Sequence, residues 1–338
     1  MDEQKSKRLI FFRPEFKILL FLFIIPTLAE LLTGSAPPVE YFNPFSLAMF
    51  IILYGGGAVL IREAKIRWWM QWSVIFLAVA YGILEEGTIV QSFFNTSHID
   101  LREMKGYGMY GGIQWTWAIN VTVFHATLST LVPISMSELL WPEYRRKALL
   151  KGRGIAIIIT LILLLTVFLM LLISSNNKIE NFRGYRPNYL LVLGSFVVVV
   201  VLIWFGYIFR KSDIISKSRV SSPITFGIAG FLFYPLLGTL VRILIGAGVH
   251  GSVAILVQCV LVVLILIFVF SQIYNIYTTQ RHIVSLITGS CLFWIVLTPL
   301  HEMGHIVNAS STKGMLVVGI VCFTFLMIWR KAVLKKIL

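Results

Sequence analysis

Two histidines four residues apart, with a glutamate directly after the first, stand at the end of a long apolar run. They are His301, Glu302 and His305 in the sequence His-Glu-Met-Gly-His. On a helix, residues four apart share a face, so both imidazoles can bind one metal ion. A carboxylate beside them can take a proton from a metal-bound water molecule. The pattern predicts a zinc site with His301 and His305 as ligands and Glu302 as general base.

Four further ionisable residues stand in or beside other apolar runs. Glu85 and Glu86 end one run, and His125 lies about ten residues inside another. The two glutamates are either solvated at the membrane surface or line a polar cavity, and because neighbours on an α-helix are about 100° apart we expect only one to face a site. His125 either bonds a neighbouring helix or belongs to an acid or metal site. Glu30, near the outer end of the first run, is expected to be solvated.

A zinc ion in a hydrolase needs a third protein ligand. No aspartate or glutamate follows Glu302 in the chain, so this ligand must come from upstream. The candidates are Glu86, Glu85 and His125. We predict Glu86 as the third ligand of the zinc ion. Either Glu85 or Glu86 can serve as that ligand or as a proton carrier, and His125 is a further catalytic residue. Zinc is thus the expected cofactor.

The composition predicts an all-α polytopic membrane protein. Of 338 residues, 58% are hydrophobic and 13% charged, whereas soluble domains carry about 25% charged residues. Long apolar runs form membrane helices because the backbone in lipid must satisfy its own hydrogen bonds. We predict one integral membrane domain, 1–338, with about ten helices. Their ranges are 16–34, 45–61, 69–87, 113–140, 154–174, 189–209, 223–246, 251–273, 283–305 and 314–329. The longest loop, 88–112, is rich in glycine and aromatic residues and is expected to re-enter the bundle or act as a lid.

The net charge of +14 is explained by topology. Most of the 29 lysines and arginines fall in alternate loops, on the side that also holds both ends of the chain. Such a bias follows the positive-inside rule, which places both termini in the cytoplasm. The basic residues therefore do not indicate nucleic-acid binding. The same topology puts the polar groups of residues 85–86, 125 and 301–305 in the outer half of the membrane.

The order of these residues resembles the CAAX-protease and bacteriocin-processing group of intramembrane metalloproteases. That family has Glu-Glu-x-x-x-Arg, and here Glu85 and Glu86 match while Val90 replaces the arginine. Its Phe-x-x-x-His motif matches at His125, with Val121 in place of the phenylalanine. Its third motif, a histidine followed four residues later by asparagine or aspartate, matches at His301 alone. The resemblance implies that Glu85 and His125 activate water and that His301 stabilises the oxyanion.

A second resemblance is local. The segment from His301 to His305 is similar to the His-Glu-x-Gly-His of site-2-type and other zinc metallopeptidases. In the site-2 group a later helix supplies an aspartate as third ligand, and this chain has no acidic residue there. Both resemblances imply hydrolysis of a peptide bond inside a membrane.

These observations leave two classes of function open, beside a scaffold in which the outer polar residues face water and the His-Glu-x-x-His sequence is chance. The first is an intramembrane metal-dependent endopeptidase that acts on a membrane-associated peptide or protein. The second is a multi-pass transporter, an ion-binding or proton-binding protein or an immunity-type membrane protein, since buried acids and histidines also mark ion pathways. For both we expect membrane lipids as partners, no nucleic acid, and a location in a bacterial or archaeal plasma membrane.

Overall fold

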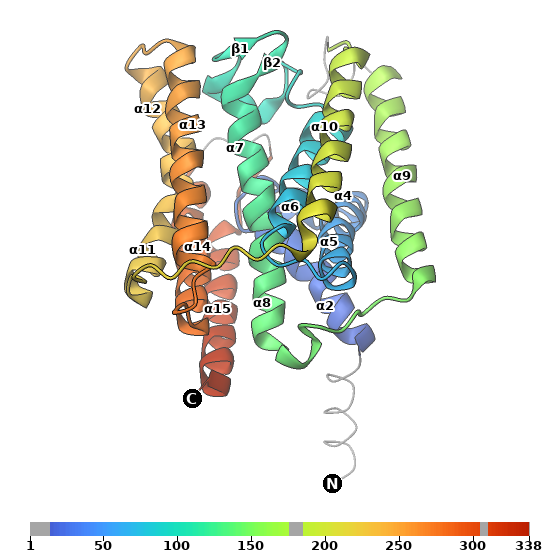
Figure 1. Ribbon diagram of the computed structural model, residues 1–338. Coiled ribbons are helices and arrows are strands. Elements are labelled where there is room, and N and C mark those ends of the chain that lie inside the picture. The colour runs from blue at the N-terminus through green and yellow to red at the C-terminus, as the bar shows by residue number, and fades with distance from the viewer. Residues whose placement is uncertain (1–13, 176–184, 305–309, 338) are drawn as a thin grey trace.

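The computed structural model is a bundle of long helices with one short hairpin (Figure 1), and it describes residues 14–175, 185–304 and 310–337. Its first half contains α2 (Pro14–Pro26), η1 (Thr27–Leu31), α3 (Pro38–Tyr41), α4 (Pro44–Phe50), η2 (Ile51–Gly55), α5 (Gly56–Arg67), α6 (Val74–Ile83), η3 (Leu84–Ile89), η4 (Ile99–Met104), β1 (Met109–Tyr110), β2 (Ile113–Gln114), α7 (Trp115–Ala126), η5 (Thr127–Leu131), α8 (Val132–Leu140) and η6 (Pro142–Tyr144). Its second half contains α9 (Gly152–Ser175), α10 (Tyr189–Ile208), η8 (Phe209–Lys211), α11 (Pro223–Tyr234), η9 (Pro235–Thr239), α12 (Leu240–Gly246), α13 (Gly251–Phe268), η10 (Val269–Ile273), α14 (Gln280–Glu302) and α15 (Met315–Ile337).

The prediction of an all-α polytopic membrane protein is confirmed. Eight helices in the described part of the chain are long and apolar enough to cross a membrane. The remaining two predicted runs are also helical, as α2 with η1 and as α6 with η3. Several boundaries differ from the prediction. The second helix continues to Arg67 rather than 61 and the third begins at Val74 rather than 69. Helix α14 ends at Glu302 rather than at 305, and α15 continues to Ile337 rather than 329.

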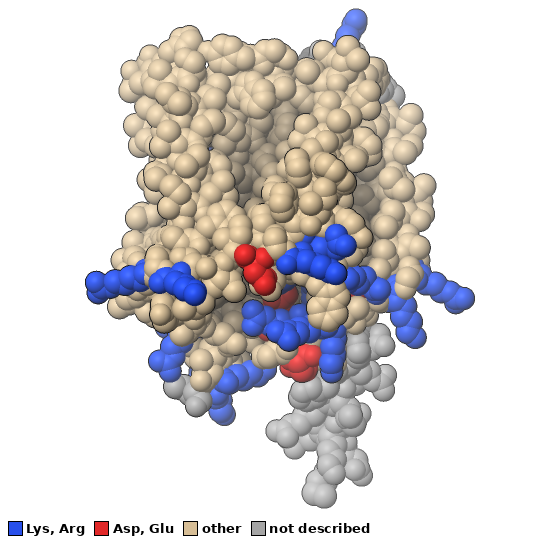
Figure 2. Space-filling model, viewed as in Figure 1, with Lys and Arg blue, Asp and Glu red and all other residues tan. Residues whose placement is uncertain are grey.

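Both ends of the described chain lie at one end of the bundle. The N-terminal end of α2 and the C-terminal end of α15 point the same way, while the β1–β2 hairpin lies at the opposite end (Figure 1). Figure 2 shows lysines and arginines gathered at the end that holds the termini, in agreement with the predicted topology. The positive-inside rule predicts that this end is cytoplasmic and that the hairpin end is external, and the two ends are named accordingly.

The helices differ in how much surface they bury inside the protein. One apolar core joins α2, α4, α5 and α6, with Ile25 and Ala58 fully buried. A second joins α8, α14 and α15 around Ile287 and Trp329. In contrast, the most apolar stretch of α9 buries none of its residues, and α10 and α13 bury few. These three helices are therefore the lipid-facing scaffold, as their uniformly apolar sequences indicated.

Small residues let neighbouring helices touch backbone to backbone. A Cβ atom on Gly289 of α14 would lie 2.0 Å from the carbonyl oxygen of Gly227 on α11. At the next helix pair, a Cβ atom on Gly319 of α15 would lie 2.0 Å from the hydroxyl of Thr298 on α14. Such close approach is the usual way in which membrane helices gain packing energy. It fixes α11, α14 and α15 as one unit.

Candidate active site of two glutamates and a histidine

Glu85, Glu86 and His125 meet in the interior of the bundle. Nε2 of His125 lies 3.0 Å from a carboxylate oxygen of Glu86, and Nδ1 lies 3.3 Å from a carboxylate oxygen of Glu85. Nδ1 is also 3.1 Å from the hydroxyl of Ser129, one helical turn further along. Glu85 is 0% exposed and His125 is 2% exposed. The glutamates are thus not solvated at the membrane surface, and both face one imidazole.

The two carboxylates differ in how they are held. Glu86 bonds His125 and accepts a short hydrogen bond from the hydroxyl of Ser92, which itself accepts one from the indole of Trp117. Neither oxygen of Glu85 accepts a hydrogen bond of good geometry from the described residues. A buried carboxylate without such partners is costly, and in native proteins it calls for an explanation such as a catalytic role. Glu86 therefore fixes the imidazole, whereas Glu85 is held less tightly, by its contact with His125 and by the nearby Tyr54 and Tyr81.

Two tyrosines and a third glutamate complete the cluster. The ring of Tyr54 lies 5.7 Å from the ring of His125, and Tyr54 interacts with both Glu30 and Glu85. Tyr81 lies one turn before Glu85, and its hydroxyl donates a hydrogen bond to the carbonyl of Leu53 at 3.0 Å. It also interacts with the carboxylate of Glu85. Glu30 is only 8% exposed, and it interacts with Glu85 and His125. The expectation that Glu30 is solvated was wrong, because its side chain is buried beside the cluster.

Local π-helical turns bring these side chains together. Glu30 lies in η1, Tyr54 in η2, Glu85 and Glu86 in η3, and Ser129 in η5, all of them π-helical. A π turn has i→i+5 hydrogen bonds and is wider than an α turn, and such turns are frequent at functional sites. The wider turn explains why adjacent glutamates reach the same imidazole. The expectation that only one of them faces a site assumed α-helical spacing and was wrong.

Glycines bring the backbones of the site helices close together. A Cβ atom on Gly82 would lie 2.9 Å from the carbonyl oxygen of Thr122 and 3.2 Å from Cβ of His125. A Cβ atom on Gly57 would lie 2.2 Å from the ring of Tyr81. Larger residues at these places would separate α6 from α7 and from α5. The distances within the cluster therefore depend on Gly82 and Gly57.

The segment between η3 and α7 covers the external side of the cluster. Gln91 has a left-handed backbone (φ 61°), which turns the chain at the end of η3 and leads into the buried Ser92. Further along, the fully buried Gln114 accepts a hydrogen bond from the amide of Gly106 at 2.9 Å and donates to the carbonyl of Asn95 at 3.3 Å. The predicted 88–112 loop thus folds back onto the bundle, and its Ser92 donates a hydrogen bond to Glu86.

The His-Glu-x-x-His motif has a different position. Helix α14 ends at Glu302, and Gly304 has a left-handed backbone (φ 72°), so the assumed continuous helix through the motif is wrong. His301 is 4% exposed and packs on Gly34, where a Cβ atom would lie 2.8 Å from the imidazole. Glu302 accepts a hydrogen bond from the amide of Leu316 at 3.2 Å. His305 lies outside the described residues.

The described residues contain one group of three side chains that can share a metal ion. Glu85, Glu86 and His125 each offer a ligand atom within 4.8 Å of the others, and His301 does not belong to this group. Two carboxylates and one imidazole suit a divalent cation such as zinc. The oxygens of Glu85 without hydrogen-bond donors fit such a ligand. A metal ion there would, however, compete with the bond between His125 and Glu86.

A large cavity lies on the other side of α7 from the cluster. Val123, Ala126 and Thr127 line it. Residues spaced in this way share one face of a helix, and the same spacing puts His125 on the opposite face. Phe124 stands beside both regions, with its ring 5.1 Å from that of His125. The cavity and the cluster are therefore two separate features of the same helix.

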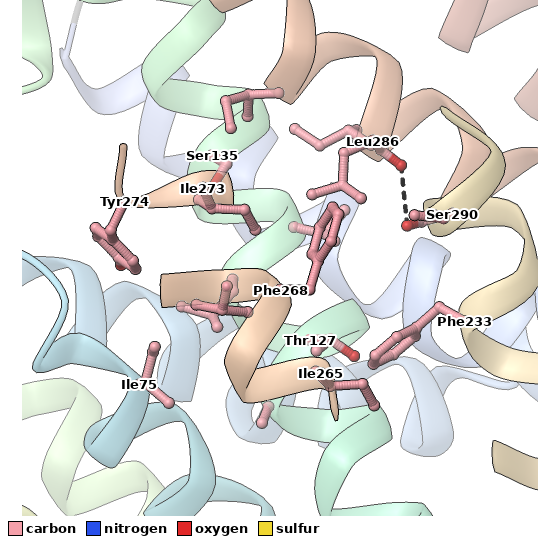
Figure 3. Close-up of a pocket in the computed structure, with 18 of the residues that line it drawn as sticks. Ile75, Thr127, Ser135, Phe233, Ile265, Phe268, Ile273, Tyr274, Leu286 and Ser290 are labelled. Atoms are coloured by element: carbon pink, nitrogen blue, oxygen red, sulfur yellow. Dashed lines mark hydrogen bonds between the residues drawn. The ribbon is translucent and has the colours of Figure 1, made fainter. Parts of the chain in front are cut away.

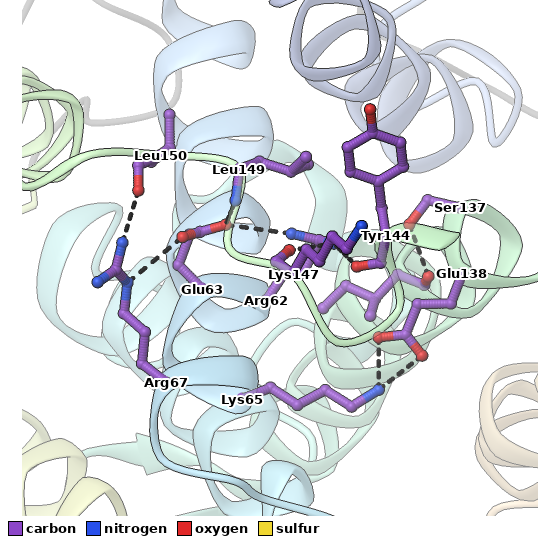
Figure 4. A network of polar contacts seen from close by, with 11 residues as sticks. Arg62, Glu63, Lys65, Arg67, Ser137, Glu138, Tyr144, Lys147, Leu149 and Leu150 are labelled. Carbon is purple, nitrogen blue, oxygen red and sulfur yellow. Dashed lines mark hydrogen bonds and ion pairs between the residues drawn. The ribbon is translucent and has the colours of Figure 1, made fainter. Parts of the chain in front are cut away.

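A second polar network lies at the cytoplasmic end (Figure 4). Arg62 donates to the neighbouring Glu63 at 3.1 Å and to the carbonyl of Tyr144 at 2.7 Å. Lys65 donates to both oxygens of Glu138 at 2.6 and 2.7 Å. Here every carboxylate has a cationic partner. The network ties α5 to α8 and to the segment that follows it.

The fold and this cluster define a polytopic helical membrane protein with a buried acid and histidine site. The chain belongs to an uncharacterized membrane protein family, whose model matches residues 19–337. No curated protein and no solved structure matches the chain. The family match supports the membrane class and does not extend to the intramembrane proteases that the motifs resemble.

Proposed function

We propose that the protein is an intramembrane hydrolase that cleaves a peptide bond of a membrane-associated substrate. The observation that carries this proposal is the pair formed by Glu85 and His125. A buried carboxylate without a good hydrogen-bond donor lies 3.3 Å from an imidazole. That imidazole is held on its other side by Glu86 at 3.0 Å. A carboxylate and a positioned imidazole are the groups that general acid and base catalysis uses.

The proposed reaction needs only a water molecule as co-reactant. Glu85 accepts a proton from this water, and the hydroxide oxygen forms a bond to the carbonyl carbon of the peptide. The C–N bond of the resulting tetrahedral species then breaks, and the proton passes through His125 to the leaving nitrogen. Glu86 and Ser129 hold the ring during both transfers. The products are a carboxylic acid and an amine, and the acid then passes its proton to the amine to give a carboxylate and an ammonium ion, so atoms and charges balance.

A zinc ion is a further part of this proposal. A zinc ion held by His301, His305 and Glu86, with Glu302 as base, stays a prediction, as does a zinc ion at the Glu85, Glu86 and His125 group. In either place the ion would polarise the carbonyl and acidify water. We expect purified protein to contain zinc in near-stoichiometric amount. Loss of zinc in His301→Ala and His305→Ala but not in His125→Ala would assign it to the first of the two sites.

An ion-binding or proton-binding transporter is the second candidate. The observation that favours it is the enclosure of the cluster, in which Glu30 adds a third carboxylate to the buried Glu85 and Glu86. Chains of intramembrane acids and histidines are typical of proton relays. In this case the same residues would carry protons without breaking a covalent bond.

The test uses the full chain reconstituted in lipid vesicles. A library of single-span peptides is added in H₂¹⁸O, and new carboxyl termini are detected by mass spectrometry. Hydrolysis puts ¹⁸O into the new carboxylate. We expect Glu85→Gln and His125→Ala to lower the cleavage rate about 10²-fold to 10⁴-fold, the usual contribution of a general acid or base. Glu138→Gln, which changes a glutamate of the cytoplasmic network, is the matched control and should cleave normally.

Two results would contradict the proposal. If the cleavage rate is unchanged in both Glu85→Gln and His125→Ala, these two residues do not take part in catalysis. Absence of labelled products, together with a proton flux across the vesicle membrane that both substitutions abolish, would establish the transporter instead.

A further inference from the structure

A cavity of about 1140 Å³ lies inside the bundle. Residues of α7 and α8 line one side, and residues of α11, η9, α13 and α14 line the others. Small-molecule pockets usually measure about 300 to 1,000 Å³, so this one is large. Apolar side chains form most of its wall, and Figure 3 shows Phe233, Ile265 and Phe268 directed into it from α11 and α13. An occupant must therefore be mainly apolar.

The cytoplasmic end of the cavity is basic. Lys65, Arg145 and Arg146 line it together with one acid, Glu138. Lys65 pairs with Glu138 at 2.6 Å, and Arg145 lies 3.9 Å from the same carboxylate with 61% of its side chain exposed. Arg146 is also exposed. Three cations against one anion leave this end positively charged.

The cavity extends far enough to hold a lipid chain. At ~1.5 Å per residue, the helical stretch from Val123 to Glu138 is about 22 Å long. The hydrocarbon layer of one leaflet is about half of the ~30 Å bilayer core. An acyl chain whose headgroup lies beside Glu138 would therefore be covered along its full depth in the cytoplasmic leaflet.

We propose that this cavity is a binding site for an anionic phospholipid. The acyl chain packs along α13 and α7, and the phosphate lies between Arg145 and Arg146 at the cytoplasmic surface. The cytoplasmic leaflet contains anionic lipids, and basic residues close to the membrane surface attract them. Because the cavity and His125 lie on opposite faces of α7, this site does not depend on the proposed hydrolase activity.

The test is native mass spectrometry of the full chain in detergent, titrated with phosphatidylglycerol or with phosphatidylcholine of identical acyl chains. We expect phosphatidylglycerol to bind about tenfold more tightly, since only its headgroup carries a net negative charge. The double variant Arg145→Gln/Arg146→Gln should bring its affinity down to that of phosphatidylcholine. The double variant Arg330→Gln/Lys331→Gln removes the same charge from α15, away from the cavity, and should bind like the original chain.

A cavity-filling variant tests the apolar part without a change of charge. Ser135 lines the cavity and is partly buried, so Ser135→Trp should lower phosphatidylglycerol binding at least tenfold. Three results would overturn the proposal. They are equal binding of both lipids, equal weakening by the two double variants, and displacement of the lipid by glycerol phosphate at the same concentration as whole phosphatidylglycerol.

Discussion

The protein buries carboxylates in two places and neutralises them in two ways. At the cytoplasmic end, Glu63 and Glu138 are paired with Arg62 and Lys65, whose charges are fixed at ordinary pH. In the external half, Glu85 and Glu86 share His125, whose charge can change. The first arrangement holds helices together. The second leaves protons that can be moved, and this is the physical difference between a structural network and a candidate active site.

The same difference appears in the backbone. The cytoplasmic network extends from regular α-helices, α5 and α8, whereas Glu30, Tyr54, Glu85 and Glu86 all lie in π turns. A π turn gives up regular hydrogen-bond geometry. The four π turns around the cluster, η1, η2, η3 and η5, therefore have an energetic cost that the packing of the bundle must offset. The comparison therefore assigns stability to the cytoplasmic end and function to the external half.

The largest expected effect separates activity from stability. Glu85→Gln should lower cleavage about 10³-fold while the melting temperature stays the same or rises, because the change removes a buried charge that has no good hydrogen-bond donor. Cleavage assays and thermal unfolding in detergent measure the two quantities. A large loss of stability with normal cleavage would reverse the roles assigned to the two clusters.

The cytoplasmic network should respond in the opposite way. Glu63→Ala leaves the 2% exposed Arg62 without its carboxylate, and breaking a buried pair costs about 3 to 5 kcal/mol of unfolding free energy. Cleavage per folded molecule should not change. Arg67→Gln is the control, because Arg67 is 40% exposed and its contact with Glu63 is 3.4 Å, so its loss should cost at most about 1 kcal/mol. Equal costs for the two variants would contradict the proposed buried network.

Gly82→Ala should weaken the contact of α6 with α7. The new methyl group would press on Thr122 and His125, and such overpacking costs about 1 to 3 kcal/mol. Because the same shift moves His125 away from Glu85, cleavage should fall as well. Gly194→Ala on α10 is the matched control, since a Cβ atom there meets nothing within 4 Å. If the two alanine variants behave alike, the glycine contact does not set the geometry of the cluster.

The smallest expected effect concerns a pair at the cytoplasmic surface. Burial alone would raise the pKa of Glu143, but its backbone amide and Lys17, whose Nζ is 3.0 Å away, lower that pKa below its ordinary value of 4.5. The carboxylate therefore adds stability above pH 4.5, and this contribution disappears as the pH falls through the lower folded pKa. Glu143→Gln should be slightly less stable than the original chain at pH 7, and this difference should shrink as the pH falls below 4.5. A difference that stays constant across this range in thermal unfolding would exclude ionisation as its cause.

The sequence predicted the helices well and the site only in part. The backbone in lipid must satisfy its own hydrogen bonds, so a long apolar run forms a helix, and each of the ten predicted ranges contains one. Glu85, Glu86 and His125 were recognisable as candidates because buried ionisable residues are rare. Glu30 and Tyr54 were not, since no local pattern distinguishes a solvated glutamate or a packing tyrosine from members of a cluster. Pro133, which lacks the N–H that would bond the carbonyl of Ser129, was the one local sign of the irregular turn there.

The sequence by itself determined the class of protein and predicts its orientation, because hydropathy and the placement of lysine and arginine act through the membrane and not through specific contacts. Only the tertiary structure decided which polar residues meet. It joins both glutamates to His125 through a π turn, brings Glu30 to the same place, and ends α14 at Glu302 before the second histidine of its motif. These outcomes depend on helix spacing at glycines such as Gly82 and on where each helix departs from α geometry. Both are properties of packing between segments far apart in the chain.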